Sequence, residues 1–144
     1  MTVAAILKHK GYLITTTDPT APIADVVSLM AEHRIGAVLV LDRAEQMLGI
    51  VSERDIVRSL ASNGARTLEM TAGQLMTRDV QVARPDTTVA EAMRIITEGR
   101  FRHLPVMDRD RLIGLVSIGD VVKARIMQQE ADVESLRAYV AGTG

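Results

Sequence analysis

The sequence predicts a mixed α+β fold (α/β-like) built from two tandem β-α-β-β-α repeats. The first observation is that residues 19–60 and residues 85–125 carry the same pattern of residue types. The second observation is that each copy ends in the spacing Gly-x-x-Ser-x-x-Asp directly after an apolar run. The motif residues are Gly49, Ser52 and Asp55 in copy one and Gly114, Ser117 and Asp120 in copy two. A duplicated pattern predicts two similar domains and two similar sites.

The repeat period is about 66 residues, because Pro19 aligns with Pro85 at that shift and Gly49 aligns with Gly114 after a one-residue deletion. This period is too long for one unit of a solenoid, which favours two small tandem domains. We expect a first domain with an N-terminal helix, a second domain and a C-terminal helical extension. Their predicted ranges are 1–66, 67–127 and 128–144.

The elements of copy one follow from its apolar periodicity. One helical face is predicted by spacing i, i+3, i+4 and i+7, at Ile23, Val26, Val27 and Met30. The continuous apolar run 37–41 predicts a buried strand. A polar turn over 42–46 leads to a second strand over 47–51, and a helix begins near Asp55.

Copy two repeats this order of elements. Its first helical face has the same spacing, at Val89, Ala92, Met93 and Ile96. Strands are expected over 104–107 and 112–116, joined by a polar turn over 108–111. The segment 62–65 is the clearest break between the copies.

The last segment predicts a helix from Gly119 to about Ala141. Its apolar residues follow an alternating spacing of four and three, with Gln129 filling the gap, at Val122, Ile126, Val133, Leu136 and Val140. A seam of about heptad period is typical of helix pairing. Two interpretations remain open: a helix folded back on its own domain, or a contact in a homodimer.

Composition excludes several classes of protein. The chain of 144 residues has a formal net charge of −1 and interspersed acids and bases, which argues against a nucleic-acid-binding surface. It has no cysteine, and its two histidines outside the repeats' motifs, His9 and His33, lack partners at metal spacing. We therefore expect no metal. No apolar run is long enough to span a membrane and no signal peptide is recognised, so a cytoplasmic location is expected.

The Ser-x-x-Asp spacing has a structural and a functional interpretation. Ser followed by an acid three residues later resembles a capping box at a helix start. The same geometry also suits a ribose phosphate, because a helix N-terminus attracts phosphate and a carboxylate accepts from two vicinal hydroxyls. The glycine three residues before the serine lets a ligand approach the backbone. Capping alone does not require that glycine in both copies.

With these residues in view, both copies resemble CBS domains, named after cystathionine beta-synthase, and the chain resembles a stand-alone CBS pair (a Bateman module). The resemblance covers about residues 2–127 and rests on both motifs, on Pro19 and Pro85, and on residues 102–106 with Asp108. It implies two repeats related by a pseudo-twofold axis with two clefts. It also implies an adenosine-containing ligand such as AMP, ADP, ATP, NAD or S-adenosylmethionine, a tendency to dimerise, and regulation rather than catalysis.

The resemblance also implies which residues line each cleft. In the first cleft Asp120 would hold the ribose, Ser117 and His103 would face the phosphates, and Ile113 would lie along the adenine. The full set is Ile14, Thr15, Ile35, Gly36, His103, Ile113, Gly114, Ser117 and Asp120. In the second cleft Asp55, Ser52 and Arg54 would take the matching roles, with Phe101 as a stacking ring. That set is Ala37, Leu48, Gly49, Ser52, Arg54, Asp55, Val80, Gln81, Phe101 and Arg102.

The two clefts are not equivalent. Gly36 and Ala37 occupy the positions matched by Arg102 and His103, so copy one lacks the local cation of copy two, for which Arg54 is the possible compensation. This difference favours the cleft around Asp120.

Two functions remain after these arguments. The first is a regulatory module that senses AMP, ADP, ATP or NAD, forms a homodimer and modulates an unknown partner protein. The alternative is a dimeric interaction scaffold that binds no ligand and uses its motifs only as helix caps. An enzyme is not expected, because the sequence contains no P-loop, no Gly-x-Gly-x-x-Gly and no Ser-His-Asp arrangement. No nucleic acid, membrane or catalytic cofactor is expected either.

Overall fold

The computed structural model describes residues 1–142 and divides the chain into two compact units. The middle unit comprises Leu13–Val80. The N/C unit combines Met1–Tyr12 with the chain from Gln81 onward. Each unit contains one of the two Ser-x-x-Asp motifs and has a core of its own, so each is described separately below.

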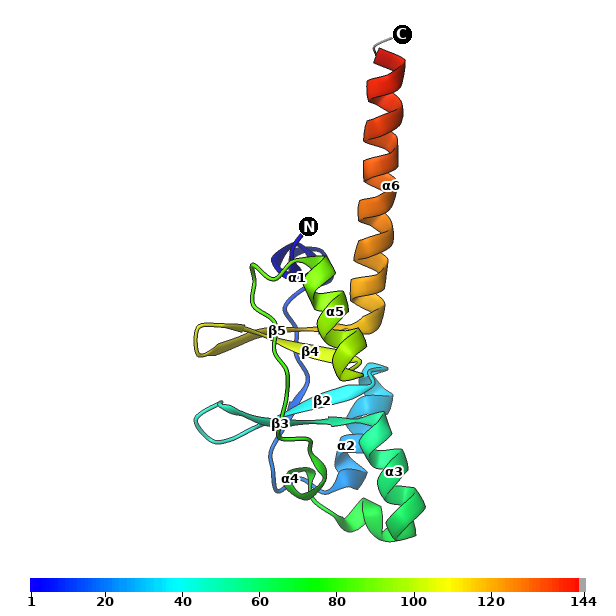
Figure 1. The fold of residues 1–144 in the computed structure, drawn as a ribbon. Coiled ribbons are helices and arrows are strands. Elements are labelled where there is room, and N and C mark those ends of the chain that lie inside the picture. Colours follow the sequence, from blue (N-terminus) through cyan, green and yellow to red (C-terminus); the bar gives the residue numbers. More distant parts are fainter. Residues whose placement is uncertain (143–144) are drawn as a thin grey trace. The chain divides into compact units, whose positions relative to one another are not determined.

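The middle unit is a three-stranded sheet with helices packed against it (Figure 1). The strand order is β1-β2-β3, with β1 parallel to β2 and β2 antiparallel to β3. Its elements are β1 (Thr16–Thr17), α2 (Ile23–His33), β2 (Ala37–Leu41), β3 (Met47–Ser52), α3 (Glu53–Asn63), the 3-10 helix η1 (Gly64–Glu69) and α4 (Ala72–Leu75).

The N/C unit has an antiparallel hairpin of two strands covered by helices. Figure 1 shows its last helix running on well past the other elements of this unit. Its elements are α1 (Val3–Lys10), α5 (Val89–Gly99), β4 (His103–Asp108), β5 (Arg111–Ser117) and α6 (Ile118–Gly142).

The mixed α+β class and the main elements confirm the sequence prediction. The predicted strand 37–41 is β2, and the other three predicted strands match β3, β4 and β5 within one or two residues at each end. The predicted helical faces are also buried: Ile23, Val26 and Met30 lie in one core, and Val89, Ala92 and Ile96 lie in the other. Burial of these faces fixes each helix against its own sheet.

The prediction of a first strand in copy two was wrong. Copy one has β1, where the amide of Leu39 donates to the carbonyl of Thr15. Copy two has only an isolated parallel bridge between Ala83 and Val106. The residue that matches Leu39 is Pro105, which has no N–H to donate. A single missing donor thus reduces the predicted strand to one bridge, and Val80 and Gln81 lie outside any strand.

The two compact units differ from the linear domains expected at 1–66 and 67–127, because the segment upstream of each repeat belongs to the unit of the other repeat. Helix α1 buries Val3, Ile6 and Leu7 in the core of the N/C unit, which contains β4 and β5 of copy two. In the middle unit, the amide of Ile23 donates to the carbonyl of Met70 at 2.7 Å. The segment before each repeat therefore packs with the other repeat.

Helix α6 does not fold back on its unit. Its buried residues are Val121 and Ala124, which lie in its first two turns. The predicted seam is exposed instead: relative exposure is 50% at Ile126, 48% at Val133 and 64% at Leu136. This finding contradicts the first of the two interpretations of the C-terminal seam.

Among the helices of the described chain, none combines the length and the apolar character that crossing a membrane requires.

Candidate functional site

The second motif lies where β5 passes into α6. The amide of Ser117 donates to Oδ2 of Asp120 at 2.8 Å, and the amide of Asp120 donates to Oγ of Ser117 at 3.1 Å. These two bonds are the reciprocal pair of a capping box. They fix the carboxylate at the N-terminus of the longest helix of the unit, where unsatisfied amides attract negative charge.

A lysine that the sequence analysis did not select completes this site. Nζ of Lys10 donates to Oδ2 of Asp120 at 2.6 Å and to the carbonyl of Leu115 at 2.8 Å. Lys10 is the last residue of α1, which ends there because Gly11 adopts a φ of 106°. The Lys10 and Asp120 side chains keep relative exposures of 36% and 25%. The ion pair therefore lies at the surface, within reach of a ligand.

The electrostatics of the site keep Asp120 ionised. Burial opposes ionisation and by itself would raise the pKa of Asp120. The hydrogen bond and charge of Lys10, together with the bonds from Ser117, outweigh burial and lower the pKa below its usual value of 3.8. At neutral pH the carboxylate is thus a fixed acceptor.

The first motif has different partners: Ser52 and Thr77 donate to the carboxylate of Asp55. Oδ2 of Asp55 accepts from the amide and from Oγ of Ser52, both at 2.9 Å. Oδ1 of Asp55 accepts from Oγ1 of Thr77 at 3.2 Å. Both carboxylate oxygens are therefore used within the middle unit, and Ser52 with Asp55 forms a complete capping box on α3. This geometry fits the structural interpretation of the motif.

Strand register places the flanking residues of both motifs in matching positions. His103 pairs with Ser117 in the hairpin, as Ala37 pairs with Ser52 in the other sheet. The residue after each serine donates its backbone amide to the residue that precedes the neighbouring strand. The amide of Ile118 donates to the carbonyl of Arg102 at 2.7 Å, and the amide of Glu53 donates to the carbonyl of Gly36 at 2.9 Å. The strand positions that hold His103 and Arg102 beside the second motif are therefore held by Ala37 and Gly36 beside the first.

The remaining predicted residues are divided between the two units. The N/C unit holds half-buried His103 and Ile113 near Ser117 and Asp120, with Ile113 packed against the core. It also contains Gln81, Phe101 and Arg102 of the other set. The middle unit contains Ile14, Thr15, Ile35, Gly36, Ala37, Leu48, Gly49, Ser52, Arg54, Asp55 and Val80. Within this unit, Leu48 and Ile35 pack at the edge of the core.

The space beside the Cα atoms of the two motif glycines is occupied by other residues of the same unit. A Cβ on Gly49 would lie 2.5 Å from the carbonyl oxygen of Thr77, and a Cβ on Gly114 would lie 2.6 Å from Cδ2 of Leu7. Internal packing therefore accounts for both glycines, where the sequence analysis had assigned the space to a ligand. Leu7 and Thr77 belong to the segments exchanged between the repeats.

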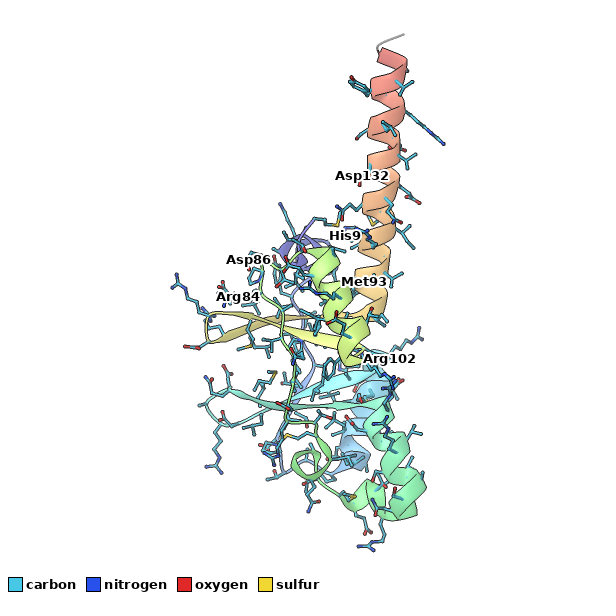
Figure 2. All side chains as sticks on the ribbon, viewed as in Figure 1. His9, Arg84, Asp86, Met93, Arg102 and Asp132 are labelled. Atoms are coloured by element: carbon cyan, nitrogen blue, oxygen red, sulfur yellow. The ribbon has the colours of Figure 1, made fainter. Side chains whose placement is uncertain are left out.

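Phe101 is the predicted stacking ring, and its ring lies against the preceding helix. A Cβ on Gly99 would overlap this ring. The ring is half-buried, and Arg102 next to it is exposed (Figure 2).

A pocket of about 450 Å³ adjoins the Lys10–Asp120 ion pair in the N/C unit. Its walls come from α1 and α6 and combine three basic side chains with apolar ones; His9 is labelled beside α6 in Figure 2. The lining residues are Met1, Ala5, Ile6, His9, Lys10, Asp120, Lys123, Ala124 and Met127. This volume can hold a small molecule, and its lining favours an anionic one.

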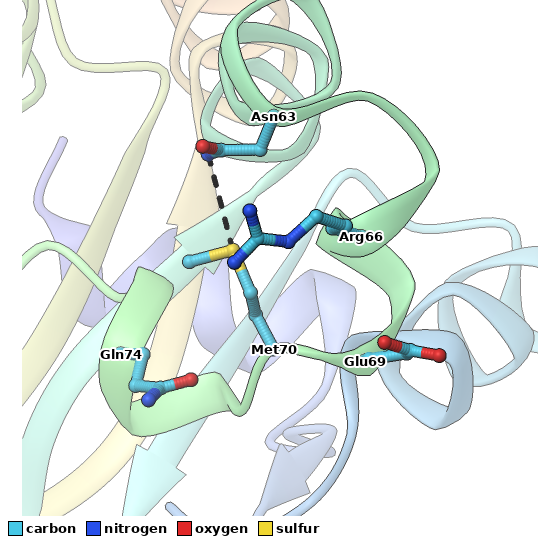
Figure 3. A pocket seen from close by; sticks show the side chains of 5 residues that line it. All are labelled: Asn63, Arg66, Glu69, Met70 and Gln74. Atoms are coloured by element: carbon cyan, nitrogen blue, oxygen red, sulfur yellow. Dashed lines mark hydrogen bonds between the residues drawn. The ribbon is translucent and has the colours of Figure 1, made fainter.

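A second pocket of about 360 Å³ lies in the middle unit, at the junction of α3, η1 and α4 (Figure 3). It is lined by Asn63, Arg66, Glu69, Met70 and Gln74. None of the residues predicted to bind a ligand belongs to this lining. The side-chain amide of Asn63 donates a hydrogen bond to Oγ of Ser59 at 3.1 Å.

Sequence reasoning missed Lys10 and Thr77, which contact the two motif aspartates. The available signal was weak: both residues lie close to the ends of the loosely matching segments upstream of each repeat. Their contacts depend on the exchange of those segments, which residue spacing alone does not reveal.

Comparison with known proteins identifies the family of this chain. The family model of the CBS domain matches residues 14–62 and 72–126. The mitochondrial CBS domain-containing protein CBSX3 of Arabidopsis thaliana is 35% identical over 98% of this chain and 72% of its own length. A solved CBS-domain protein of Agrobacterium tumefaciens is 41% identical, with a TM-score of 0.84 over 86% of this chain and 92% of that one.

A third similar protein, CBSX2, was solved in complex with AMP. It is 29% identical to this chain, with a TM-score of 0.67 over 81% of this chain and 90% of that one. Two matches to the family model, together with two repeated motifs in two similar units, show that the chain belongs to the CBS-domain family as a tandem CBS pair.

Proposed function

We propose that this protein is a regulatory module that binds an anionic adenosine-containing ligand at the Ser117–Asp120 motif. AMP, ADP, ATP and NAD are the candidate ligands, and the module acts as a homodimer that modulates a partner protein. The observation that carries the proposal is the exposed ion pair between Lys10 and Asp120 at the start of α6. The AMP complex of the similar protein CBSX2 supports the same ligand class.

The chemistry of the site suits a ribose phosphate. Lys10 and the amide of Ser117 both donate to Oδ2 of Asp120. We propose that Oδ1 accepts a hydrogen bond from a ribose hydroxyl. Because Oγ of Ser117 accepts from the Asp120 amide, its own hydroxyl proton can be donated to a phosphate oxygen. The start of α6 adds the partial positive charge of a helix N-terminus.

The lysines around Asp120 favour anionic ligands over neutral ones. Lys10 and Lys123 line the adjoining pocket together with His9, and Asp120 is the one acidic residue in that lining. A phosphate near Lys10 would compete with Asp120 for its ammonium group. We therefore expect AMP to bind more tightly than adenosine.

The alternative function, a dimeric scaffold that binds no ligand, is favoured by one observation at the other motif. Ser52 and Thr77 bond to both carboxylate oxygens of Asp55, so that this motif is complete as a helix cap. If the Ser117–Asp120 motif behaves in the same way, no ligand is needed to explain either copy.

Thermal unfolding with AMP, ADP, ATP, NAD and adenosine distinguishes the two functions. We expect an anionic nucleotide at 100 times its dissociation constant to stabilise the protein by about 2.7 kcal/mol, which raises Tm by about 5 to 10 °C. Asp120→Ala should abolish this shift, whereas Asp55→Ala should lower Tm without nucleotide but keep the shift.

The protein must be refolded from denaturant first, so that nucleotide carried through purification is removed. Absence of a shift with every nucleotide, in protein with native circular dichroism, would overturn the sensor and leave the scaffold. A shift that survives Asp120→Ala and is lost in Asp55→Ala would move the site to the first motif.

A further inference from the structure

Helix α6 presents two different faces. Val121 and Ala124 are buried against the N/C unit, at 0% and 6% relative exposure. Val122 and Ile126, on the other side of the same turns, are 39% and 50% exposed. The helix is therefore anchored by one face, and its seam of apolar residues points away from the core that anchors it.

The spacing of the seam assigns every position of a heptad without ambiguity. Steps of four lead from d to a and steps of three lead from a to d. The a positions are Ile126, Val133 and Val140, and the d positions are Val122, Gln129 and Leu136. All three a residues are β-branched and Leu136 lies at a d position, and β-branched residues at a with Leu at d favour two strands in parallel coiled coils. The polar Gln129 interrupts the apolar seam at one d position.

Charges beside the seam select one orientation of the partner helix. In a parallel pair, each g residue faces the e residue five positions further along the partner. Arg125 at g then faces the partner's Glu130 at e, and Asp132 at g faces the partner's Arg137 at e. All four residues are exposed, so each contact pairs opposite charges that are available for it.

The antiparallel arrangement is disfavoured by the same residues. There, g faces g and e faces e across the seam. With the seam fully overlapped, so that Val122 meets the partner's Val140, Asp132 faces the partner's Asp132 and Glu130 faces the partner's Glu130. Like charges in these positions oppose pairing.

We propose that α6 forms a parallel, in-register, two-stranded coiled coil with α6 of a second copy of this chain. The seam from Val122 to Leu136 and the two complementary g–e pairs carry the proposal. At 1.5 Å per residue, the paired length from Val122 to Val140 is about 27 Å. The inference deepens the homodimer part of the proposed function and does not depend on ligand binding.

Single-cysteine variants test the orientation directly, because the chain has no cysteine of its own. In a parallel in-register coil, Leu136→Cys at a d position brings the two sulfurs of a dimer into bonding range. We expect it to form a disulfide-linked dimer in a glutathione redox buffer. Ser135→Cys is the matched control at a c position, which points away from the seam, and should remain largely unlinked.

Charge reversal tests the pairing across the seam. Arg125→Glu places a carboxylate opposite the partner's Glu130 and should weaken the dimer about tenfold in sedimentation equilibrium. The double change Arg125→Glu with Glu130→Arg restores opposite charges and should return the dissociation constant to within about threefold of the original.

The outcomes of these experiments distinguish the homodimer from the parallel coiled coil. A wild-type chain that sediments as a monomer at 100 times the concentration used for the ligand assay overturns both the homodimer and the coil. A dimer in which Leu136→Cys does not link faster than Ser135→Cys overturns the coil and keeps the homodimer. A dimer joined by an antiparallel pair, or a seam that binds a different protein, would give this second result. The nucleotide-induced shift in Tm is measured independently of all these outcomes.

Discussion

Lys10 makes the second motif different from an ordinary helix cap. Capping needs only Ser117 and Asp120, which already bond to each other reciprocally. Lys10 adds a charged and partly exposed partner to the carboxylate, at 2.6 Å. In the first motif, Thr77 contacts Asp55 with a hydroxyl. A charged and exposed partner can exchange for a ligand group, whereas a neutral internal bond is typical of a structural contact.

Replacement of Lys10 by Met tests its effect on Asp120. Met keeps most of the aliphatic length, but it removes the hydrogen bond and the charge that lower the pKa of Asp120. Burial, which raises this pKa, then acts against fewer opposing contacts. We expect the pKa of Asp120 to rise in Lys10→Met, measured by carbon-detected NMR titration. Lys8→Met is the control, because Lys8 is an exposed lysine on the same helix.

The sign of the pH dependence follows from the same shift. A carboxyl group whose pKa is lower in the folded than in the unfolded state stabilises the fold above its unfolded value, here 3.8. That contribution is lost as pH falls through the folded pKa. Because the pair is partly exposed, wild type should exceed Lys10→Met by only about 0.5–1 kcal/mol at pH 7. A difference that persists at pH 2 would contradict this explanation.

At this scale the sequence predicted the motif residues but not their partners. Ser117 and Asp120 are three residues apart, and their reciprocal bonds follow from local helix geometry alone. Lys10 lies 110 positions from Asp120 along the chain. Its contact depends on where α1 packs, and no local pattern contains that information.

At the scale of elements, the capping box of α3 has a measurable energy. Oγ of Ser52 accepts from the amide of Asp55 at 3.3 Å and donates to its carboxylate at 2.9 Å. We expect Ser52→Ala to lower the free energy of unfolding by about 1 kcal/mol in urea denaturation. Ser62→Ala is the control, since Ser62 bonds only to the Arg58 carbonyl in the last turn of the same helix. A loss no larger in Ser52→Ala than in the control would show that the cap contributes little.

Strands and helices were predictable where burial produces a recognisable pattern of apolar residues. They were not predictable where the presence of a strand depends on a single hydrogen-bond donor. The runs that became β2 and β3 are apolar because both strands lie in the core. The first strand of copy two depends on a hydrogen bond that Pro105 cannot donate. The helical seam of α6 was visible in the sequence, but only the exposure of Leu136, at 64%, decided between its two interpretations.

At the scale of the whole molecule, each compact unit combines one repeat with the segment that precedes the other repeat in the sequence. Helix α1 precedes copy one in the sequence but packs with copy two, and the segment around Met76 and Thr77 packs with copy one. Domain boundaries drawn along the sequence therefore divide each compact unit. The duplication itself was evident from sequence, because it repeats residue types at fixed spacing. The sequence did not show that the upstream segments pack with the other repeat, because packing with either repeat buries the same apolar residues.

Leu7 offers a direct test of this exchange. It is fully buried beside Gly114 in the core of the N/C unit. Leu7→Ala should lower the free energy of unfolding by about 2–5 kcal/mol, because it leaves a cavity there. Hydrogen exchange should then quicken in β4 and β5 more than in β2 and β3, since protection reports local opening.

Leu13→Ala is the matched control, because Leu13 is 97% exposed and its truncation removes no core contact. If the N-terminal helix instead belonged to a domain of residues 1–66, Leu7→Ala would loosen β2 and β3 first. The strand pair that loses protection therefore decides between units that are discontinuous in the sequence and consecutive domains. This measurement needs no ligand, so its result is independent of the proposed nucleotide binding.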